Sequence, residues 1–174
     1  MRKVEPYNPL DKKNLAESAA SALLRQEPEI LPPEPFEGAG IYAIYYMGEF
    51  PAYRPLAEKN RERLEAPIYV GKADPKGGRR GGELDAPVGA ALSDRLRKHA
   101  RSIEQANNLD LSDFRCRYLV LDDVWVRMAE RMLIAWYNRF GTLSWMASAI
   151  MTLANVEQPN IDHLGIFFIR VALG

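Results

Sequence analysis

The sequence predicts an α/β (α+β) fold in which a small three-stranded sheet is flanked by helices. Three short runs, residues 40–47, 67–71 and 114–121, are rich in β-branched and aromatic side chains, which is typical of strands. Three longer segments, residues 10–26, 92–103 and 124–137, are predicted to be helices. At 174 residues the chain is long enough for one domain with its own core.

The first 37 residues are expected to form an N-terminal helix followed by a proline-rich arm. Apolar residues in the helical segment recur at three- and four-residue spacings among charges, at Leu10, Leu15, Ala19, Ala22 and Leu23. Pro28 ends this helix, and Pro32, Pro33 and Pro35 remove backbone donors from the segment that follows. We therefore expect residues 29–38 to be an extended linker, with the main domain at residues 38–138.

Within residues 38–138 the runs at 40–47 and 67–71 are expected to be paired strands. The residues between them are too many for a tight hairpin and too polar for a core, so residues 48–66 are predicted to be a surface insertion. Glycines and basic residues dominate the stretch 72–82, which predicts a flexible basic loop.

Overall charge and cysteine content restrict the possible classes of protein. Lys and Arg together number 23 and Asp and Glu number 23, so bulk charge does not predict a polyanionic partner. Cys116 is the single cysteine, which excludes an internal disulfide and fits a reducing cytosol. The N-terminus lacks the apolar stretch of a secretory signal, and no apolar run is long enough to span a bilayer. We expect a cytoplasmic protein.

Five polar or aromatic residues stand in a recognisable order along the predicted elements. The first strand reads Gly40-Ile41-Tyr42, the second reads Tyr69-Val70-Gly71-Lys72, Arg95 and His99 share a helix, and Glu130 lies on a later helix. This set resembles the GIY-YIG nuclease superfamily over roughly residues 38–138. The resemblance implies the fold of that superfamily, a small central, mainly antiparallel three-stranded sheet flanked by helices.

Within the superfamily, the chain is similar to restriction endonucleases of SacII specificity, which cut CCGCGG. The long insertion, the Arg-x-x-x-His helix and the segment 129–134 carry this similarity. It implies a type II restriction endonuclease that requires Mg²⁺ (or Mn²⁺) and cuts a short GC-rich palindrome in double-stranded DNA. A homodimer would match the two-fold symmetry of such a site.

Hydrolysis of a phosphodiester needs an activated water, neutralised charge and a leaving oxygen, and the five residues suit these needs. Glu130 is the carboxylate of the set and is assigned the Mg²⁺. Arg95 and His99 project from one helix face, so Arg95 can grip the phosphate while His99 orients or moves a proton. The resemblance assigns Tyr42 as the general base, with Tyr69 hydrogen-bonded beside it.

A tyrosine base is chemically demanding. Its pKa near 10 would have to fall by about three units, roughly 4 kcal/mol, and Lys72, Arg95 and the metal are the cations available to lower it. Residues 72–101 hold eight basic side chains against four acidic ones. Beside a nuclease motif this favours phosphate contact, and the candidate DNA-binding residues are Lys72, Lys76, Arg79, Arg80, Arg97, Lys98 and Arg101.

The last part of the chain departs from the resemblance. The superfamily relatives carry a Trp-Asn pair and a glycine-rich segment after the glutamate, whereas residues 139–157 form an apolar string without periodicity. Restoring one lost C before the codon of Arg139 allows the missing segment to be read in another frame. We hypothesise that residues 139–174 are a frameshifted tail and that Thr142 occupies the position of an active-site asparagine; resequencing the gene tests this.

Other interpretations stay open at this point. The chain could be a repair or homing-type GIY-YIG nuclease, although it has no appended DNA-binding domain. It could be a decayed, catalytically impaired remnant that binds DNA without cutting it. Taken singly, strand tyrosines usually pack in cores, and a glutamate between arginines is usually a solvated helix face, so an unrelated α/β domain with coincidental motifs is the plainest alternative.

Overall fold

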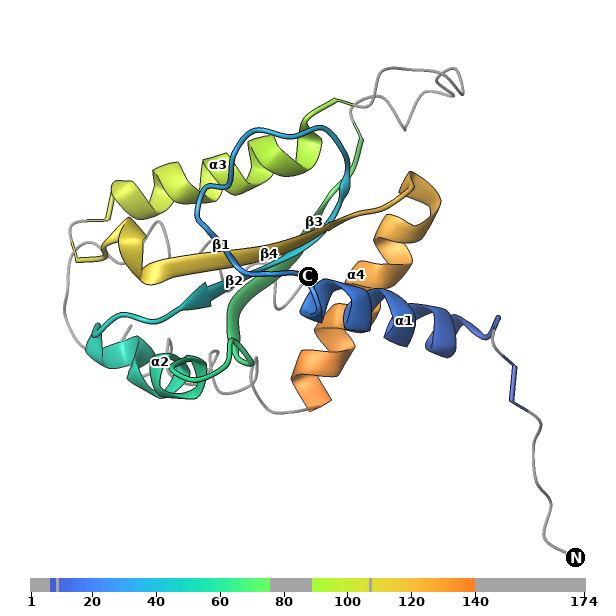
Figure 1. The fold of residues 1–174 in the computed structure, drawn as a ribbon, viewed down its shortest axis with the longest axis horizontal. Coiled ribbons are helices and arrows are strands. Elements are labelled where there is room, and N and C mark those ends of the chain that lie inside the picture. The colour runs from blue at the N-terminus through green and yellow to red at the C-terminus, as the bar shows by residue number, and fades with distance from the viewer. Residues whose placement is uncertain (1–6, 9, 76–88, 107, 140–174) are drawn as a thin grey trace, which may run out of the picture.

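The structure is a computed structural model that describes residues 7–8, 10–75, 89–106 and 108–139. A central sheet lies between helices, with α3 on one side and α1 with α4 on the other (Figure 1). In chain order the elements are α1 (Lys12–Leu24), β1 (Glu29–Ile30), β2 (Gly40–Tyr46), α2 (Arg54–Asn60), β3 (Pro67–Ala73), α3 (Ala91–Glu104), β4 (Phe114–Val120) and α4 (Asp123–Arg139). No helix in these described ranges is long and apolar enough to cross a membrane.

The sheet is antiparallel, with strand order β1-β4-β2-β3. This confirms the predicted α+β class and the three long strands. The sheet has one strand more than the three predicted. Glu29 and Ile30 pair with Cys116 and Arg115 and form the edge strand β1. The prolines that suggested an extended arm follow these two residues, and a two-residue strand leaves no periodic pattern to recognise.

Strand β2 is central and buried along its whole length, since both of its faces are covered. One face, with Tyr42, Ile44 and Tyr46, packs against residues of α2 and α3. The other face, with Ile41 and Tyr45, packs against α1 and α4. The alternation of side chains along a strand therefore sends Tyr42 toward α3 and Tyr45 toward α4.

The segment between β2 and β3 is partly core, which corrects the prediction of an insertion lying on the surface. It contains α2, whose Leu56 and Ala57 are buried against the sheet. Asn60 is also buried, and its side chain bonds the carbonyls of Tyr46 and Ala66 and the amide of Ala66, each at 2.9 Å. A polar side chain that ties two strands together carries no apolar signal, so the sequence pattern missed it.

The N-terminal helix packs on the main domain through α4 and β4. Asp11 caps α1 by accepting a hydrogen bond from the amide of Lys13 at 2.9 Å. Leu10, predicted to lie within the helix, precedes this cap and is exposed. Cys116 is buried as a free thiol.

Candidate active site

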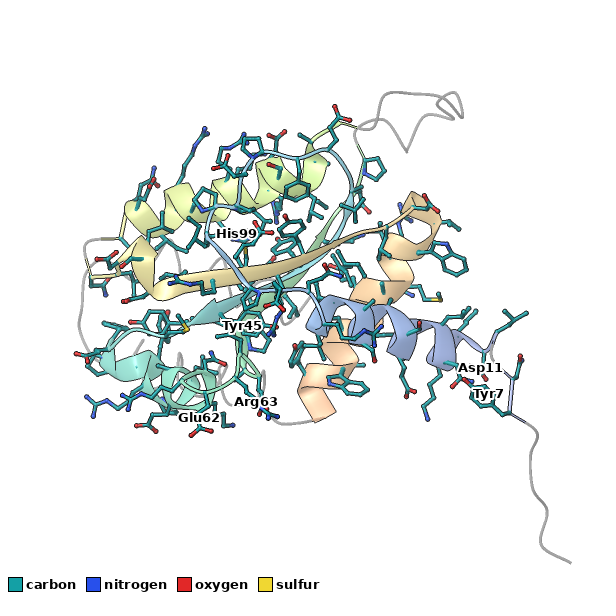
Figure 2. The ribbon with its side chains drawn as sticks, viewed as in Figure 1. Tyr7, Asp11, Tyr45, Glu62, Arg63 and His99 are labelled. Carbon is teal, nitrogen blue, oxygen red and sulfur yellow. The ribbon has the colours of Figure 1, made fainter. Side chains whose placement is uncertain are left out.

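Arg95 and His99 lie one turn apart on α3, and both reach the hydroxyl of Tyr42 on β2. His99 Nε2 is 2.7 Å from the Tyr42 oxygen, and Arg95 Nε is 3.4 Å from it. Residues four apart share a helix face, and here that face is turned toward the sheet; Figure 2 shows His99 between α3 and the strands. The Arg-x-x-x-His spacing therefore places a cation and an imidazole on one phenol oxygen.

The second motif tyrosine completes a cluster of three rings. The ring centroids of Tyr42, Tyr69 and His99 lie 4.7 to 5.8 Å apart, and the proximity of Tyr69 raises the pKa of Tyr42. Gly71 makes this packing possible, because a Cβ there would lie 2.8 Å from the Tyr69 ring and 2.9 Å from the Tyr42 oxygen. A larger residue at position 71 would therefore displace the two tyrosines.

Donor and acceptor roles in this cluster follow from the groups present. A guanidinium nitrogen only donates, so the Tyr42 oxygen accepts from Arg95. A neutral imidazole with its proton on Nδ1 leaves Nε2 to accept the proton of Tyr42. Burial, together with the nearby charge of Arg95, lowers the pKa of His99 to about 3, so His99 is neutral at physiological pH. The Tyr42 hydroxyl is accordingly placed to donate to His99.

The pKa of Tyr42 is raised well above its ordinary value, chiefly by burial and next by the neighbouring Tyr69. Arg95 lowers this pKa, but not enough to offset burial. The expectation that Lys72 would help to lower the pKa is corrected, because Lys72 contacts carboxylates: its Nζ is 3.0 Å from Asp74 and 3.7 Å from Glu130. A free tyrosinate is therefore not the resting state of Tyr42.

A cleft of about 590 Å³ opens beside the edge strand β3, between α3 and α4. Tyr69, Arg95 and Glu130 line it, together with Lys72, Ala73, Asp74, Ala91, Asp94 and Lys98. Tyr42 and His99 do not line the cleft; both are buried and contact it through Tyr69 and Arg95. The five predicted site residues thus form one connected group, with three at the cleft and two behind them.

A larger groove of about 930 Å³ lies elsewhere, beside the loop after α2 and the end of α4. Figure 2 labels two residues of its wall, Glu62 and Arg63. None of the predicted site residues lines this groove. The smaller cleft is therefore the candidate active site, because three of the five predicted site residues, Tyr69, Arg95 and Glu130, line it.

Glu130 is the acidic group of the candidate site. Its side chain is 19% exposed and faces the ammonium of Lys72, which also contacts Asp74. Burial raises the pKa of Glu130, Lys72 lowers it, and Asp74 raises it further. A half-buried carboxylate on a cleft, with its charge only partly balanced, is a favourable place for an added cation.

The donor set fits a hard divalent ion that retains most of its waters. Such an ion needs one or two carboxylates rather than a full protein cage, and Glu130 and Asp74 both line the cleft. Among the described residues no group of three or more His, Cys, Asp or Glu side chains could hold a metal. A cation at this cleft would therefore rest on Glu130 and retain most of its waters.

The predicted DNA-binding residues fall into three groups. Lys72 and Lys98 line the cleft. Arg97 and Arg101 lie on α3 without lining it, and Arg97 is held by Asp94 at 3.1 Å. Lys76, Arg79 and Arg80, and also Thr142 with the proposed frameshifted tail from residue 140 onward, lie outside the described residues.

Sequence reasoning missed Asp74 and Gly71 as parts of the site. Gly71 was visible as the last letter of the second motif, but its contacts with two tyrosines become evident only in three dimensions. Asp74 carried no signal, because its position matters through Lys72 and through Glu130 on a distant helix. Sequence spacing along one helix predicts neighbours, whereas spacing between elements does not.

Comparisons with known proteins identify the family of the chain. No match is found among curated proteins. A family model described as the Eco29kI GIY-YIG domain matches residues 34–144, which is more than half of the chain and includes all five residues of the candidate site. GIY-YIG nucleases generally use divalent metal ions. The chain belongs to the Eco29kI GIY-YIG family and is a nuclease domain that acts on DNA.

Proposed function

We propose that this protein is a type II restriction endonuclease that hydrolyses phosphodiester bonds at a short GC-rich palindrome in double-stranded DNA, in the cytoplasm where that DNA is found. One observation carries the proposal: the Tyr42 hydroxyl contacts both Arg95 and His99 directly behind the cleft that holds Glu130. A buried phenol bonded to a neutral imidazole is arranged to move a proton. The match to an Eco29kI-type domain supports the same reaction class.

Proton transfer is proposed to run through the tyrosine pair. An attacking water in the cleft gives its proton to Tyr69, Tyr69 passes its own proton to the neighbouring Tyr42, and Tyr42 passes its own to His99 Nε2. Each tyrosine oxygen gains one proton as it loses one, so neither tyrosine has to exist as a free anion. In this route the energetic demand passes from Tyr42 to His99, whose pKa of about 3 has to rise when the negative phosphate enters the cleft.

Charge in the transition state is proposed to be met by Arg95 and by a cation on Glu130. Arg95 lines the cleft while its Nε holds Tyr42, and its guanidinium is proposed to contact phosphate oxygens there. Mg²⁺ or Mn²⁺, held by Glu130, would supply Lewis-acid neutralisation of the phosphate. Lys72 and Lys98 line the same cleft and would contact the DNA backbone, joined by Lys76, Arg79, Arg80, Arg97 and Arg101.

The specificity proposed for the enzyme is that of SacII, CCGCGG, read by a homodimer. To test it, a plasmid with a single CCGCGG site and a matched plasmid without one are incubated with purified protein and Mg²⁺. A single linear product from the first plasmid alone supports the proposal. Equal cutting of both plasmids, or cutting at a different sequence, contradicts this specificity while leaving nuclease activity in place.

A second candidate is a DNA-binding remnant that has lost cleavage. Thr142 standing where the resemblance places an asparagine favours it, and the family match ends at residue 144, close to the proposed frame change at Arg139. The same plasmid assay, run on the chain as given and on a version with the frame restored, separates the two. Retardation of DNA without cutting by the given chain, and cutting by the restored one, would identify the remnant.

A further inference from the structure

We propose that Asp74 is a positioning residue that holds the Lys72 ammonium and so keeps Glu130 available to the catalytic cation. The inference rests on the proposed function, because it concerns the cation that Glu130 would bind there. It concerns Lys72, which lies on β3, and Asp74, which directly follows that strand. Neither the second motif nor the spacing of the two residues predicts that Asp74 holds the Lys72 ammonium.

The contacts place Lys72 between two carboxylates with unequal distances. Its Nζ is 3.0 Å from Asp74 Oδ2 and 3.2 Å from Asp74 Oδ1, against 3.7 Å from Glu130 Oε2. Asp74 therefore makes the hydrogen-bonded contact, and Glu130 makes only the longer ionic one. All three side chains line the same cleft.

In this arrangement the Lys72 ammonium and a divalent cation compete for the carboxylate oxygens of Glu130. A lysine ammonium is a compact charge with three donors, and the two carboxylates are its ion-pair partners among the described residues. With Asp74 neutralised, the ammonium would turn to Glu130 and occupy the oxygens that a divalent cation needs. With Asp74 present, the cation can bind Glu130 while Lys72 remains paired beside it, its charge still facing the cleft.

Exposure decides how large the effect can be. The side chains of Lys72 and Glu130 are 24% and 19% exposed, so solvent screens their attraction only in part, whereas Asp74 is 46% exposed. Pairs near the surface are worth less than about 1 kcal/mol, so we expect Asp74→Asn to weaken cation binding by up to about fivefold. Lys72→Met should strengthen it by a similar factor, because the competitor is gone.

The experiment measures equilibrium binding of Mn²⁺ alone to the full chain, without DNA, by isothermal titration calorimetry. Wild type, Asp74→Asn, Lys72→Met and the double variant form a thermodynamic cycle. We expect Asp74→Asn to weaken binding in the presence of Lys72 and to have little effect once Lys72 is Met. Glu58→Gln, which removes an exposed carboxylate of α2 that does not line the cleft, is the control and should leave binding close to wild type.

Every other outcome contradicts one part of the proposal, either the positioning role of Asp74 or the cation site on Glu130. If Asp74→Asn weakens Mn²⁺ binding equally in both backgrounds, Asp74 acts as a ligand or as a bare charge, and the positioning role is wrong. If Asp74→Asn changes nothing while Glu130→Gln abolishes binding, the positioning role is wrong but the proposed cation site stands. If Glu130→Gln leaves binding unchanged, or wild type binds no Mn²⁺, the cation site itself is wrong. Circular dichroism spectra matching wild type ensure that each variant is folded.

Discussion

Tyr42 is the residue on which the proposed chemistry depends, because its oxygen contacts Arg95 and His99 and its ring packs against Tyr69. Tyr42→Phe keeps the ring and removes that oxygen. We expect the single-turnover cleavage rate to fall by about 10²- to 10⁴-fold, the usual contribution of a positioned acid or base. Stability should fall by about 1–3 kcal/mol, since His99 Nε2 would lose its buried partner.

The matched control for Tyr42 is its neighbour on the other face of the same strand. The Tyr45 hydroxyl is 3.4 Å from that of Tyr137, on the side of α4, and does not contact His99 (Figure 2). Tyr45→Phe should leave the cleavage rate within a few-fold of wild type. Equal rate losses in the two variants would mean that the Tyr42 hydroxyl has no chemical role.

The lowered pKa of His99 predicts that the free energy of unfolding depends on pH. Its folded pKa of about 3 lies below the ordinary value of 6.5, so between these values the unfolded chain binds a proton that the folded chain does not. The stability contributed by neutral His99 is therefore complete above pH 6.5 and is lost as pH falls toward 3. The slope should approach about 1.4 kcal/mol per pH unit within that window.

The measurement is urea unfolding of wild type and His99→Gln at pH 7.0, 6.0 and 5.0. Wild type should lose stability on acidification more steeply than the variant, because Gln does not titrate. An identical slope for wild type and His99→Gln would show that His99 is protonated in the folded state.

At the scale of elements, strand β3 shapes the site through a position that carries no side chain. Gly71→Ala would place a methyl group 2.8 Å from the Tyr69 ring and 2.9 Å from the Tyr42 oxygen, so both rings would have to move. A displacement of reacting groups by about 1 Å can cost on the order of 100-fold in rate. We expect this variant to lose cleavage while keeping most of its secondary structure by circular dichroism.

Gly89→Ala is the control for Gly71→Ala, because no atom of the part of the chain that the structure describes lies within 4 Å of a Cβ at that position. It should leave the cleavage rate at the wild-type level. Wild-type cleavage by Gly71→Ala would mean that the contact between the two tyrosines does not matter for the reaction.

The sequence predicted the elements better than it predicted how they meet. The apolar runs located β2, β3 and β4 within a residue or two, and helix periodicity put Arg95 and His99 on one face. The sequence did not reveal that Tyr42 is buried behind Tyr69. It also did not reveal that Lys72 forms ion pairs with two carboxylates rather than lowering the pKa of a tyrosine. Those facts depend on strand register and on the packing of α3 and α4, which periodicity within a single element does not encode.

At the scale of the whole molecule, a palindromic target predicts two subunits that each cut one strand. Mixing wild-type protein with an excess of Glu130→Gln subunits should then yield nicked circular plasmid, because most active subunits would sit beside an inactive partner. Mixing with an excess of bovine serum albumin is the control and should leave linear product. Linear product in both mixtures would indicate a monomer that cuts both strands.

The measurement that tests the central claim most directly is Mg²⁺-dependent cleavage of plasmid DNA by the frame-restored protein and its Glu130→Gln variant. The claim is that the tyrosine pair, Arg95, His99 and a cation on Glu130 act on one phosphate at the cleft beside β3. We expect cleavage by the first protein that stops when EDTA removes the cation, and none by the variant. Equal cleavage by both proteins would contradict the claim.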